Sequence, residues 1–206
     1  MSLSEPLRVL FVCTGNVCRS PFAEILARHL FAAHGLPAEV SSAGTNPPVG
    51  APLHRDMRRA LAGWGLDGGP AEVCRARLLE VGMVASADLV LGATVEHRAA
   101  IVRTAPKGLR HTFALREFAR LVVGLDPDLL PTDPAQRGRA LVAAARAQRG
   151  ARPVAPGEDD IADPIGRPAA AHLEAAGSIA DALVAITAAL VGITPAQVRA
   201  SALSAR

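Results

Sequence analysis

The stretch RVLFVCTGNVCRSPFAEILARHL, residues 8–30, constrains the fold more than any other part of the chain. Its apolar start, rich in β-branched and aromatic side chains, predicts a buried strand over residues 7–12. Proline in a first-turn position and apolar residues at helical spacing then predict a helix over residues 20–34. The apolar face of that helix comprises Phe22, Ile25, Leu26, Leu30 and Phe31. The stretch is therefore a strand, a loop and a helix in succession.

The same alternation continues along the chain. Further strands are expected at residues 40–43, 87–91 and 111–114. Further helices are expected at residues 52–62, 94–102 and 168–190. Strands that alternate with helices indicate a parallel sheet covered by helices on both faces, and such sheets bind ligands at the carboxyl ends of their strands. The loop after the first strand lies at that end.

The length of 206 residues predicts a single domain, residues 1–206, with two peripheral segments. Residues 122–157 are rich in proline, alanine and arginine, and we expect an insertion with one exposed helix. Its five arginines predict a solvated face, with docking of an acidic partner as the alternative. They are Arg137, Arg139, Arg146, Arg149 and Arg152. The tail from residue 194 is expected to be poorly ordered.

Composition limits the classes of partner. The chain has 22 Lys and Arg against 19 Asp and Glu, a balance that does not favour nucleic-acid binding. The N-terminus lacks the pattern of a secretory leader, and the apolar segment 179–193 is short for a membrane span and carries Asp181. We therefore expect a cytoplasmic protein, and its three cysteines are expected to be thiols.

The loop itself predicts phosphoryl chemistry. Backbone N–H groups at a helix N-terminus bind anions, and Gly15 and Asn16 tolerate the left-handed backbone angles that turn such groups inward. Cys13, at the strand end, would be held there as a thiolate nucleophile. Arg19 supplies a planar fork for two phosphate oxygens, and Ser20 can donate to the sulfur. Covalent phosphoryl transfer is the predicted reaction.

The stretch VCTGNVCRSP resembles the phosphate loop of the low-molecular-weight protein tyrosine phosphatases. The resemblance extends to SSAGT at 41–45, ADLVL and EHR within 87–98, and DIADPIG at 160–166. It implies a three-layer α/β fold with a four-stranded parallel sheet, doubly wound in the flavodoxin-like or Rossmann-like manner. It also implies that Cys13 is the nucleophile, that Arg19 clamps phosphate, and that a distant aspartate is the general acid, with no metal or cofactor.

The resemblance assigns the remaining loop residues to phosphate binding. These residues are Thr14, Gly15, Asn16, Val17, Cys18 and Ser20. Ser42, in SSAGT, is expected to hydrogen-bond Asn16 and support the loop, or otherwise to be an ordinary turn serine.

Three Asp-Pro pairs compete for the role of general acid, at Asp126, Asp133 and Asp163. Proline restricts the residue before it to extended angles, which suits both an aimed carboxylate and a helix start. Asp163 continues as Asp-Pro-x-Gly, the acid motif of the family, and is therefore the predicted acid. Asp133 precedes an alanine-rich run and is predicted to cap a helix.

Two alternatives stay open for Cys18. It can fill the first helical turn, or it can form a reversible disulfide with Cys13 that protects the nucleophile from over-oxidation. A zinc site made of Cys13, Cys18 and Cys74 is disfavoured, because the sequence has no Cys-x-x-Cys pair and no nearby histidine cluster.

The substrate is the least constrained prediction. A phosphorylated protein is expected, with phosphotyrosine as the main candidate and a bacterial tyrosine kinase system as a partner by family analogy. Pro47 and Ile165-Gly166 stand where tyrosine-specific relatives place aromatic walls, and Cys74 stands where several relatives have a histidine. The small β-branched Val17 makes protein-arginine phosphatase the alternative.

Two further classes are weaker. An arsenate reductase shares the loop but needs further cysteines as a relay, and Cys74 is the only candidate. A non-catalytic phosphopeptide-binding module is disfavoured because Cys13, Arg19 and Asp163 are all present.

Overall fold

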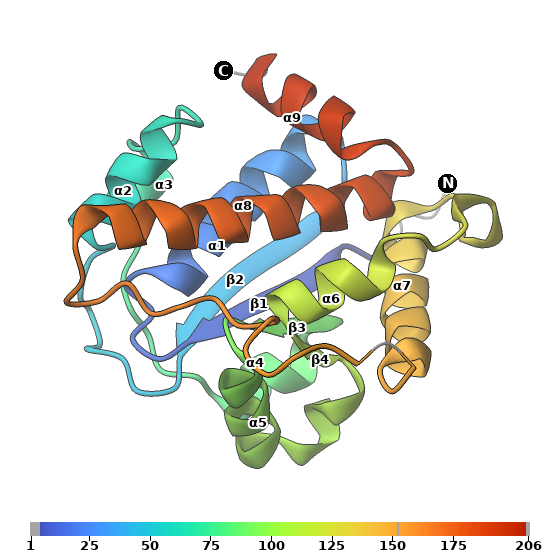
Figure 1. The fold of residues 1–206 in the computed structure, drawn as a ribbon, viewed down its shortest axis with the longest axis horizontal. Coiled ribbons are helices and arrows are strands. Elements are labelled where there is room, and N and C mark those ends of the chain that lie inside the picture. Colours follow the sequence, from blue (N-terminus) through green and yellow to red (C-terminus); the bar gives the residue numbers. More distant parts are fainter. Residues whose placement is uncertain (1–4, 152, 205–206) are drawn as a thin grey trace.

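The computed structural model describes residues 5–151 and 153–204, and a parallel sheet forms the centre of this part of the chain (Figure 1). Its strands are β1 (Leu7–Cys13), β2 (Ala38–Gly44), β3 (Leu89–Gly92) and β4 (Thr112–Ala114), in the order β2-β1-β3-β4. All three pairings are parallel. The predicted four-stranded α/β fold is confirmed, and each expected strand is present within two residues of its predicted ends.

The register brings the carboxyl ends of the strands to one edge. Cys13 pairs with Gly44 on β2, while Val12 pairs with Gly92 on β3. Gly92 in turn pairs with Ala114 on β4. The segments that follow β2 and β3 therefore lie on either side of the loop that begins at Cys13.

Helices cover both faces of the sheet (Figure 1). The longer ones are α1 (Arg19–Ala33), α2 (Arg55–Ala62), α5 (Val95–Thr104), α6 (Leu115–Val122), α7 (Pro134–Gln148), α8 (Ala169–Val191) and α9 (Pro195–Ser204). Short turns of helix are α3 (Pro70–Val73), α4 (Val81–Ser86), η1 (Pro106–Arg110) and η2 (Pro127–Leu129).

Alternate residues of β1 belong to two separate cores. Val9 and Phe11 lie in the larger cluster, with the buried side chains of α1, α2 and α6 to α9. Leu10 and Val12 lie in the smaller cluster, with Val84 of α4 and Ile101 of α5. Because successive side chains of a strand point to opposite faces, an apolar run without polar alternation is what a sheet buried on both faces requires.

The prediction of an exposed helix in residues 122–157 is wrong. Asp133 caps α7 as predicted, with its carboxylate accepting the Gln136 N–H at 2.8 Å, but the helix packs against β1, α6 and α8. A Cβ at Gly138 would lie 2.7 Å from Leu7 of β1, so glycine permits this close approach. Alanine and glycine give weak hydrophobic periodicity, and for this reason the sequence did not reveal the buried face.

The arginines of this segment do not form one solvated face. Arg139 pairs with Asp88 at 3.0 Å, and Arg149 pairs with Glu117 at 3.0 Å. The Arg149 guanidinium also lies 4.1 Å from the ring centre of Phe113. Two of the five cations are therefore neutralised by acids from elsewhere in the fold.

The other three arginines differ from one another. Arg137 is buried and donates to the Ala189 carbonyl at 3.0 Å, whereas Arg146 is exposed. Arg152 lies outside the described residues. The solvated-face prediction therefore holds for Arg146 alone among the described members.

The prediction of a poorly ordered tail is also wrong for residues 194–204. They form a turn and α9, in which Val198 and Ala202 are fully buried. The Ala202 carbonyl lies 2.9 Å from Nε2 of His29 on α1. The helix therefore covers the end of α1.

Helix α8 is long and apolar enough to cross a membrane, but it is a core helix in this fold. Of the most apolar 18-residue stretch of α8, 61% is buried inside the protein. It packs along α1, α2 and α6 and ends at Gly192, whose φ of 75° is the left-handed conformation that glycine accepts readily.

Candidate active site

The loop between β1 and α1 begins at Cys13, the last residue of β1, and ends at Arg19, the first residue of α1. Both side chains are buried. Asn16 has a φ of 49° and supplies the left-handed turn of the loop. Of the two residues that tolerate left-handed angles, Gly15 is not among those with positive φ. Asn16 is therefore the residue whose left-handed backbone turns the loop around the sulfur.

Two groups lie within hydrogen-bond distance of the Cys13 sulfur. The Asn16 backbone N–H donates to Sγ at 3.3 Å, and Ser20 Oγ lies 3.0 Å from the same atom. Ser20 Oγ also lies 3.3 Å from the Ala43 carbonyl. Hydrogen bonds of this kind stabilise negative charge on the sulfur, as a nucleophile or a leaving group requires.

The Asn16 side chain is held by three partners. Its amide donates to Ser42 Oγ at 2.8 Å and to Ser20 Oγ at 2.9 Å, so the expected contact with Ser42 is present. Its carbonyl oxygen accepts the Arg77 backbone N–H at 3.0 Å. Ser42 donates in turn to Glu24 at 2.6 Å. Sequence reasoning missed Glu24 and Arg77, which carry no motif.

The end of β2 approaches the loop closely. A Cβ at Gly44 would lie 2.5 Å from the Thr14 carbonyl oxygen, so this position requires glycine. Thr45 N–H donates to the Cys13 carbonyl at 2.9 Å, and Asn46 N–H donates to the Thr14 carbonyl at 3.0 Å. The stretch SSAGT therefore braces the loop through its backbone.

His97, in the stretch EHR, holds the Thr14 side chain. Its Nε2 lies 2.9 Å from Thr14 Oγ1, and its Nδ1 lies 2.7 Å from Thr94 Oγ1. The imidazole is buried, and burial followed by the nearby Arg19 guanidinium lowers the pKa of His97. The ring is therefore neutral at pH 7. The local sequence around His97 gives no sign of this role, because Thr14 lies in a distant segment of the chain.

Arg19 is joined to the predicted acid from the far end of the chain. Its guanidinium donates to Asp163 Oδ2 at 2.7 Å and to the Ile161 carbonyl at 3.0 Å. Asp133, by contrast, is engaged in capping α7. Of the described residues, none accepts a hydrogen bond from the buried Arg19 Nε. The structure thus brings Asp163 to the loop and leaves one guanidinium donor available there.

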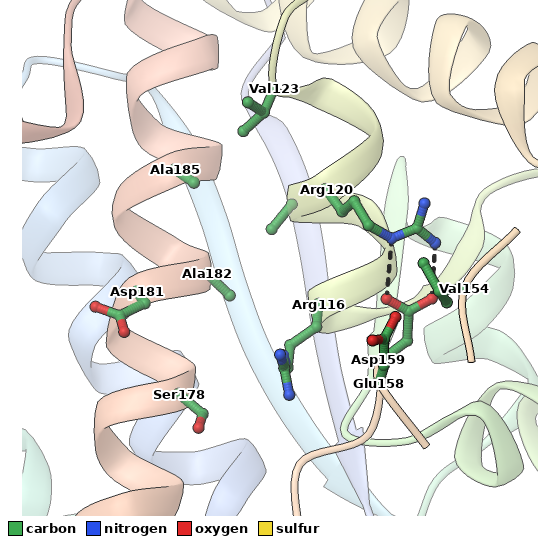
Figure 2. A pocket seen from close by; sticks show the side chains of 11 residues that line it. Arg116, Arg120, Val123, Val154, Glu158, Asp159, Ser178, Asp181, Ala182 and Ala185 are labelled. Atoms are coloured by element: carbon green, nitrogen blue, oxygen red, sulfur yellow. Dashed lines mark hydrogen bonds and ion pairs between the residues drawn. The ribbon is translucent and has the colours of Figure 1, made fainter. Parts of the chain in front are cut away.

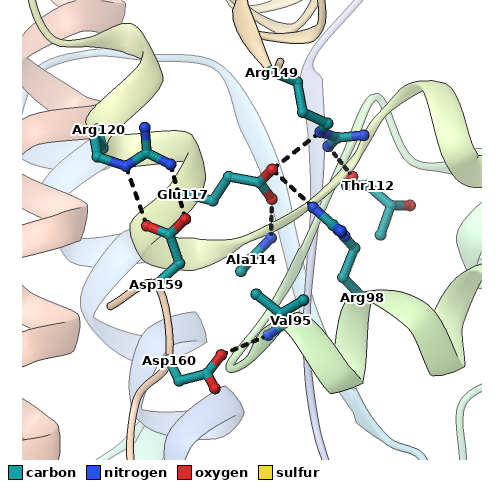
Figure 3. A network of polar contacts seen from close by, with 9 residues as sticks. All are labelled: Val95, Arg98, Thr112, Ala114, Glu117, Arg120, Arg149, Asp159 and Asp160. Atoms are coloured by element: carbon teal, nitrogen blue, oxygen red, sulfur yellow. Dashed lines mark hydrogen bonds and ion pairs between the residues drawn. The ribbon is translucent and has the colours of Figure 1, made fainter. Parts of the chain in front are cut away.

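The segment that carries Asp163 is anchored to two helices, α6 and α5 (Figure 3). Arg120 of α6 pairs with Asp159 through two contacts, at 2.8 and 3.2 Å. Asp160 accepts the N–H of Val95, the first residue of α5, at 2.7 Å. These contacts precede Asp163 by only a few residues, so they restrict where its carboxylate can lie.

Glu117 forms a second buried junction beside this segment (Figure 3). Its Oε1 accepts from Arg98 at 2.8 Å and from Arg149 at 3.0 Å. Its Oε2 accepts the Ala114 backbone N–H at 2.9 Å. One carboxylate therefore ties α5, β4 and the end of α7 to α6.

A pocket of about 560 Å³ opens beside the phosphate loop. Its lining comprises Thr14, Arg19, Thr45, Thr94, Glu96, His97, Ala100, Arg103 and residues 160–163. Among these described lining residues there is no phenyl or indole ring. A separate pocket of about 480 Å³ lies between α6 and α8, is lined in part by the Arg120–Asp159 pair, and has no residue of the phosphate loop in its lining (Figure 2).

Cys18, beside Arg19, is a buried free thiol, and Cys13 and Cys74 are free as well. Burial, followed by the nearby Cys13, raises the pKa of Cys18 to about 12. Cys18 is therefore protonated at neutral pH. Its two open roles, packing and a disulfide with Cys13, are both compatible with this state.

Comparisons with known proteins agree with this geometry. The profile of the family described as low molecular weight phosphotyrosine protein phosphatase matches residues 8–148. A low-molecular-weight protein-tyrosine-phosphatase of Streptomyces coelicolor is 35% identical over 139 residues, 64% of this chain and 80% of the relative. A protein-arginine-phosphatase of Geobacillus stearothermophilus is 34% identical over 125 residues, 60% of this chain and 77% of the relative.

Solved structures show the same similarity. The low-molecular-weight protein tyrosine phosphatase from T. tengcongensis superimposes with a TM-score of 0.64 and 28% identity, covering 87% of this chain and 96% of the other. The arginine phosphatase from Geobacillus stearothermophilus gives a TM-score of 0.61 and 28% identity, covering 88% and 91%. With the fold, the loop and the family profile in agreement, this chain belongs to the low-molecular-weight protein tyrosine phosphatase family.

Proposed function

We propose that this chain is a single-domain phosphoprotein phosphatase that acts through a phosphocysteine at Cys13, with phosphotyrosine as its main substrate. Membership of the family implies a phosphorylated protein as substrate. The individual roles of Cys13, Arg19 and Asp163 are inferred from their positions in the structure.

The observation that carries the proposal is the state of Arg19. Its Nε is buried and lacks an acceptor among the described residues, on the same side chain whose other nitrogens reach Asp163 and Ile161. An unsatisfied buried donor costs free energy, and a phosphate oxygen would satisfy it. A guanidinium and a phosphate also match in geometry, since both can form two parallel hydrogen bonds.

In the first step, the Cys13 thiolate attacks phosphorus and forms the S–P bond while the bond from phosphorus to the leaving oxygen breaks. Asp163 gives its proton to that oxygen. Arg19 and the loop N–H groups stabilise the equatorial oxygens in the transition state. The dephosphorylated protein then leaves with the transferred proton.

In the second step, water attacks the phosphocysteine. The Asp163 carboxylate takes a proton from the water, the S–P bond breaks, and inorganic phosphate is released. Ser20 and the Asn16 N–H stabilise the departing thiolate, because both lie within hydrogen-bond distance of the sulfur. The cycle ends with Cys13 as thiolate and Asp163 protonated again.

Protein-arginine phosphatase is the second candidate, and a specific observation favours it. All five phenylalanines are buried in the core, so they cannot form walls for a phenyl ring at the site. Exposed Ile165 follows the acid loop instead. Loss of one aromatic stacking partner weakens phenyl binding by about 1 kcal/mol. Two of the similar proteins, from Geobacillus stearothermophilus and Bacillus subtilis, are named protein-arginine-phosphatases.

The remaining proposals concern context. A bacterial tyrosine kinase is the proposed partner that supplies phosphotyrosine, and the cytoplasm is the proposed location. The kinase follows from family analogy. The location follows from the free cysteines, because a reducing compartment keeps thiols unpaired.

Phosphate release by the wild type and by Cys13→Ser, on matched phosphotyrosine and phosphoarginine peptides, tests the proposal. Cysteine-dependent release that favours phosphotyrosine supports the main proposal. A preference for phosphoarginine would instead support the second candidate, a protein-arginine phosphatase. Equal activity of the wild type and Cys13→Ser would falsify the covalent mechanism.

The choice of acid is tested by Asp163→Asn, with Asp126→Asn as the matched control from another Asp-Pro pair. Loss of a general acid lowers kcat by about 10²- to 10⁴-fold, so we expect that loss for Asp163→Asn with phenyl phosphate. Asp126→Asn should retain wild-type kcat. Equal effects of the two substitutions would remove Asp163 from the mechanism.

A further inference from the structure

A cluster of three potential metal ligands lies behind the phosphate loop. The ligand atoms of Cys18, His54 and His172 all lie within 4.8 Å of one another. Cys18 precedes α1, His54 precedes α2, and His172 lies in the first turn of α8. The sequence separates these residues widely, so only the packing of the three helix starts brings them together.

One ligand atom of the cluster has no partner. His172 is buried, and its Nδ1 lies 3.4 Å from the Pro168 carbonyl; since a carbonyl oxygen can only accept a hydrogen bond, Nδ1 carries the hydrogen and donates it. The lone pair is then on Nε2, which is buried and without a hydrogen-bond partner among the described residues. Buried polar atoms are rarely left in this state, and a metal ion would accept this lone pair.

The other two ligands suit the same ion. Cys18 is a buried free thiol, and His54 is half-buried, which leaves a path for an ion from solvent. The His54 backbone N–H donates to the Val17 carbonyl at 2.7 Å, so the loop itself positions this histidine. One thiolate and two imidazoles are ligands that zinc prefers, with a fourth position left for water.

We propose that Cys18, His54 and His172 form a binding site for a divalent zinc ion. On binding, the Cys18 thiol releases its proton to solvent and the sulfur bonds to the metal, while the two imidazoles donate lone pairs. A zinc-bound Cys18 is unavailable to Cys13 for disulfide formation. The site therefore joins α1, α2 and α8 and keeps the nucleophile free.

The cluster must rearrange slightly to bind. The rings of His54 and His172 are stacked, with centroids 4.4 Å apart and planes inclined by 12°, so their lone pairs do not yet converge. For both lone pairs to reach one ion, the side-chain torsion angles of at least one of the two histidines must therefore change. The His54 Nδ1 also accepts the Asp56 N–H at 3.3 Å, a long helix-cap bond that metal binding would replace.

Cobalt(II) is the probe, since a thiolate bound to cobalt gives a charge-transfer absorption band. The titration uses the full chain with Cys13→Ser, which removes the competing nucleophile and isolates this test from the proposed catalytic mechanism. We expect one cobalt per chain, a thiolate band, displacement by zinc, and weaker binding at lower pH because protons compete for all three ligands.

His172→Phe and His54→Ala in the same background should each weaken cobalt binding by about a hundredfold or more, since loss of even an outer-sphere partner costs about ten- to a hundredfold. Cys74→Ser and His34→Gln are the matched controls and should bind as the parent does. His54 is half-buried, so His54→Ala serves if His172→Phe does not fold. Absence of the band in the parent, or an unchanged band in His54→Ala, overturns the proposal.

Discussion

The side chains of the phosphate loop depend on partners that are distant in the sequence, and Thr14 is the clearest case. His97 Nε2 lies 2.9 Å from Thr14 Oγ1, and Thr94 holds the opposite ring nitrogen at 2.7 Å. Thr14 also contributes a backbone carbonyl that accepts the Asn46 N–H. The side-chain and backbone contacts together define the orientation of the first loop residue after Cys13.

We expect His97→Ala to lower kcat/KM by about fivefold. The net value of a hydrogen bond is about 1 kcal/mol, and its loss would leave Thr14 free to rotate into the phosphate site. A double-mutant cycle with Thr14→Val isolates this contact, because the second substitution should cost little once the first is made. Strictly additive losses would show that His97 acts elsewhere.

The same histidine makes stability depend on pH. The pKa of His97 is lowered in the folded protein, chiefly by burial, so the unfolded chain takes up a proton at higher pH than the folded chain does. The free energy of unfolding should therefore fall as pH drops below about 6.5. Urea unfolding at pH 7 and pH 5 should show a smaller fall for His97→Gln, and equal falls would contradict this account.

Among the structural elements, the segment that leads into Asp163 has no regular structure, so its position depends on its anchors. The paired contacts between Arg120 and Asp159 attach it to the last turn of α6, and the bond from Val95 to Asp160 attaches it to the start of α5. The Ile161 N–H also donates to the Ala93 carbonyl at 2.9 Å. These contacts let a non-helical segment present a carboxylate at a defined point.

Arg120→Met should loosen this segment and impair protonation of the leaving group. We expect kcat to fall more for phenyl phosphate than for p-nitrophenyl phosphate, because the poorer leaving group depends more on the acid. Arg58→Met, which breaks the exposed pair with Glu72, is the control and should leave this ratio unchanged. Equal losses on both substrates would place the effect of Arg120 outside acid catalysis.

For the molecule as a whole, α7 is part of the core and the segment 122–157 is not an independent appendage. Ala135, Leu141 and Ala145 are fully buried, and Gly138 lies against Leu7 of the central strand. Arg149, at the end of α7, reaches Glu117 and the Phe113 ring. The helix therefore stabilises the same sheet that carries Cys13.

Gly138→Val should lower the free energy of unfolding by about 1 to 3 kcal/mol, since its side chain would overlap the Leu7 methyl groups. Gly177→Val is the matched control, because a Cβ at Gly177 on α8 meets nothing within 4 Å. Chemical denaturation of both variants measures the difference. A Gly138→Val variant as stable as the control would mean that α7 can move away from β1 without loss.

The strand, loop and helix around Cys13 could be predicted from sequence because the relevant physics is local. An apolar run, a loop with Asn16 and a proline in the first helical turn each specify their own backbone. The same holds for Asp133, whose cap bond joins residues three apart. Family motifs then indicated Asp163 and the contact of Ser42 with Asn16.

The remaining features arise from packing between distant segments. His97, Glu24 and Arg77 reach the loop from separate elements, and nothing in the local sequence of each encodes that encounter. The burial of α7 and α9 escaped prediction because small residues give a weak periodic pattern, although they allow close approach. Local sequence thus specified the backbone of the loop. Which side chains hold that loop was decided by long-range packing, because contact between distant segments depends on the shape of the whole core.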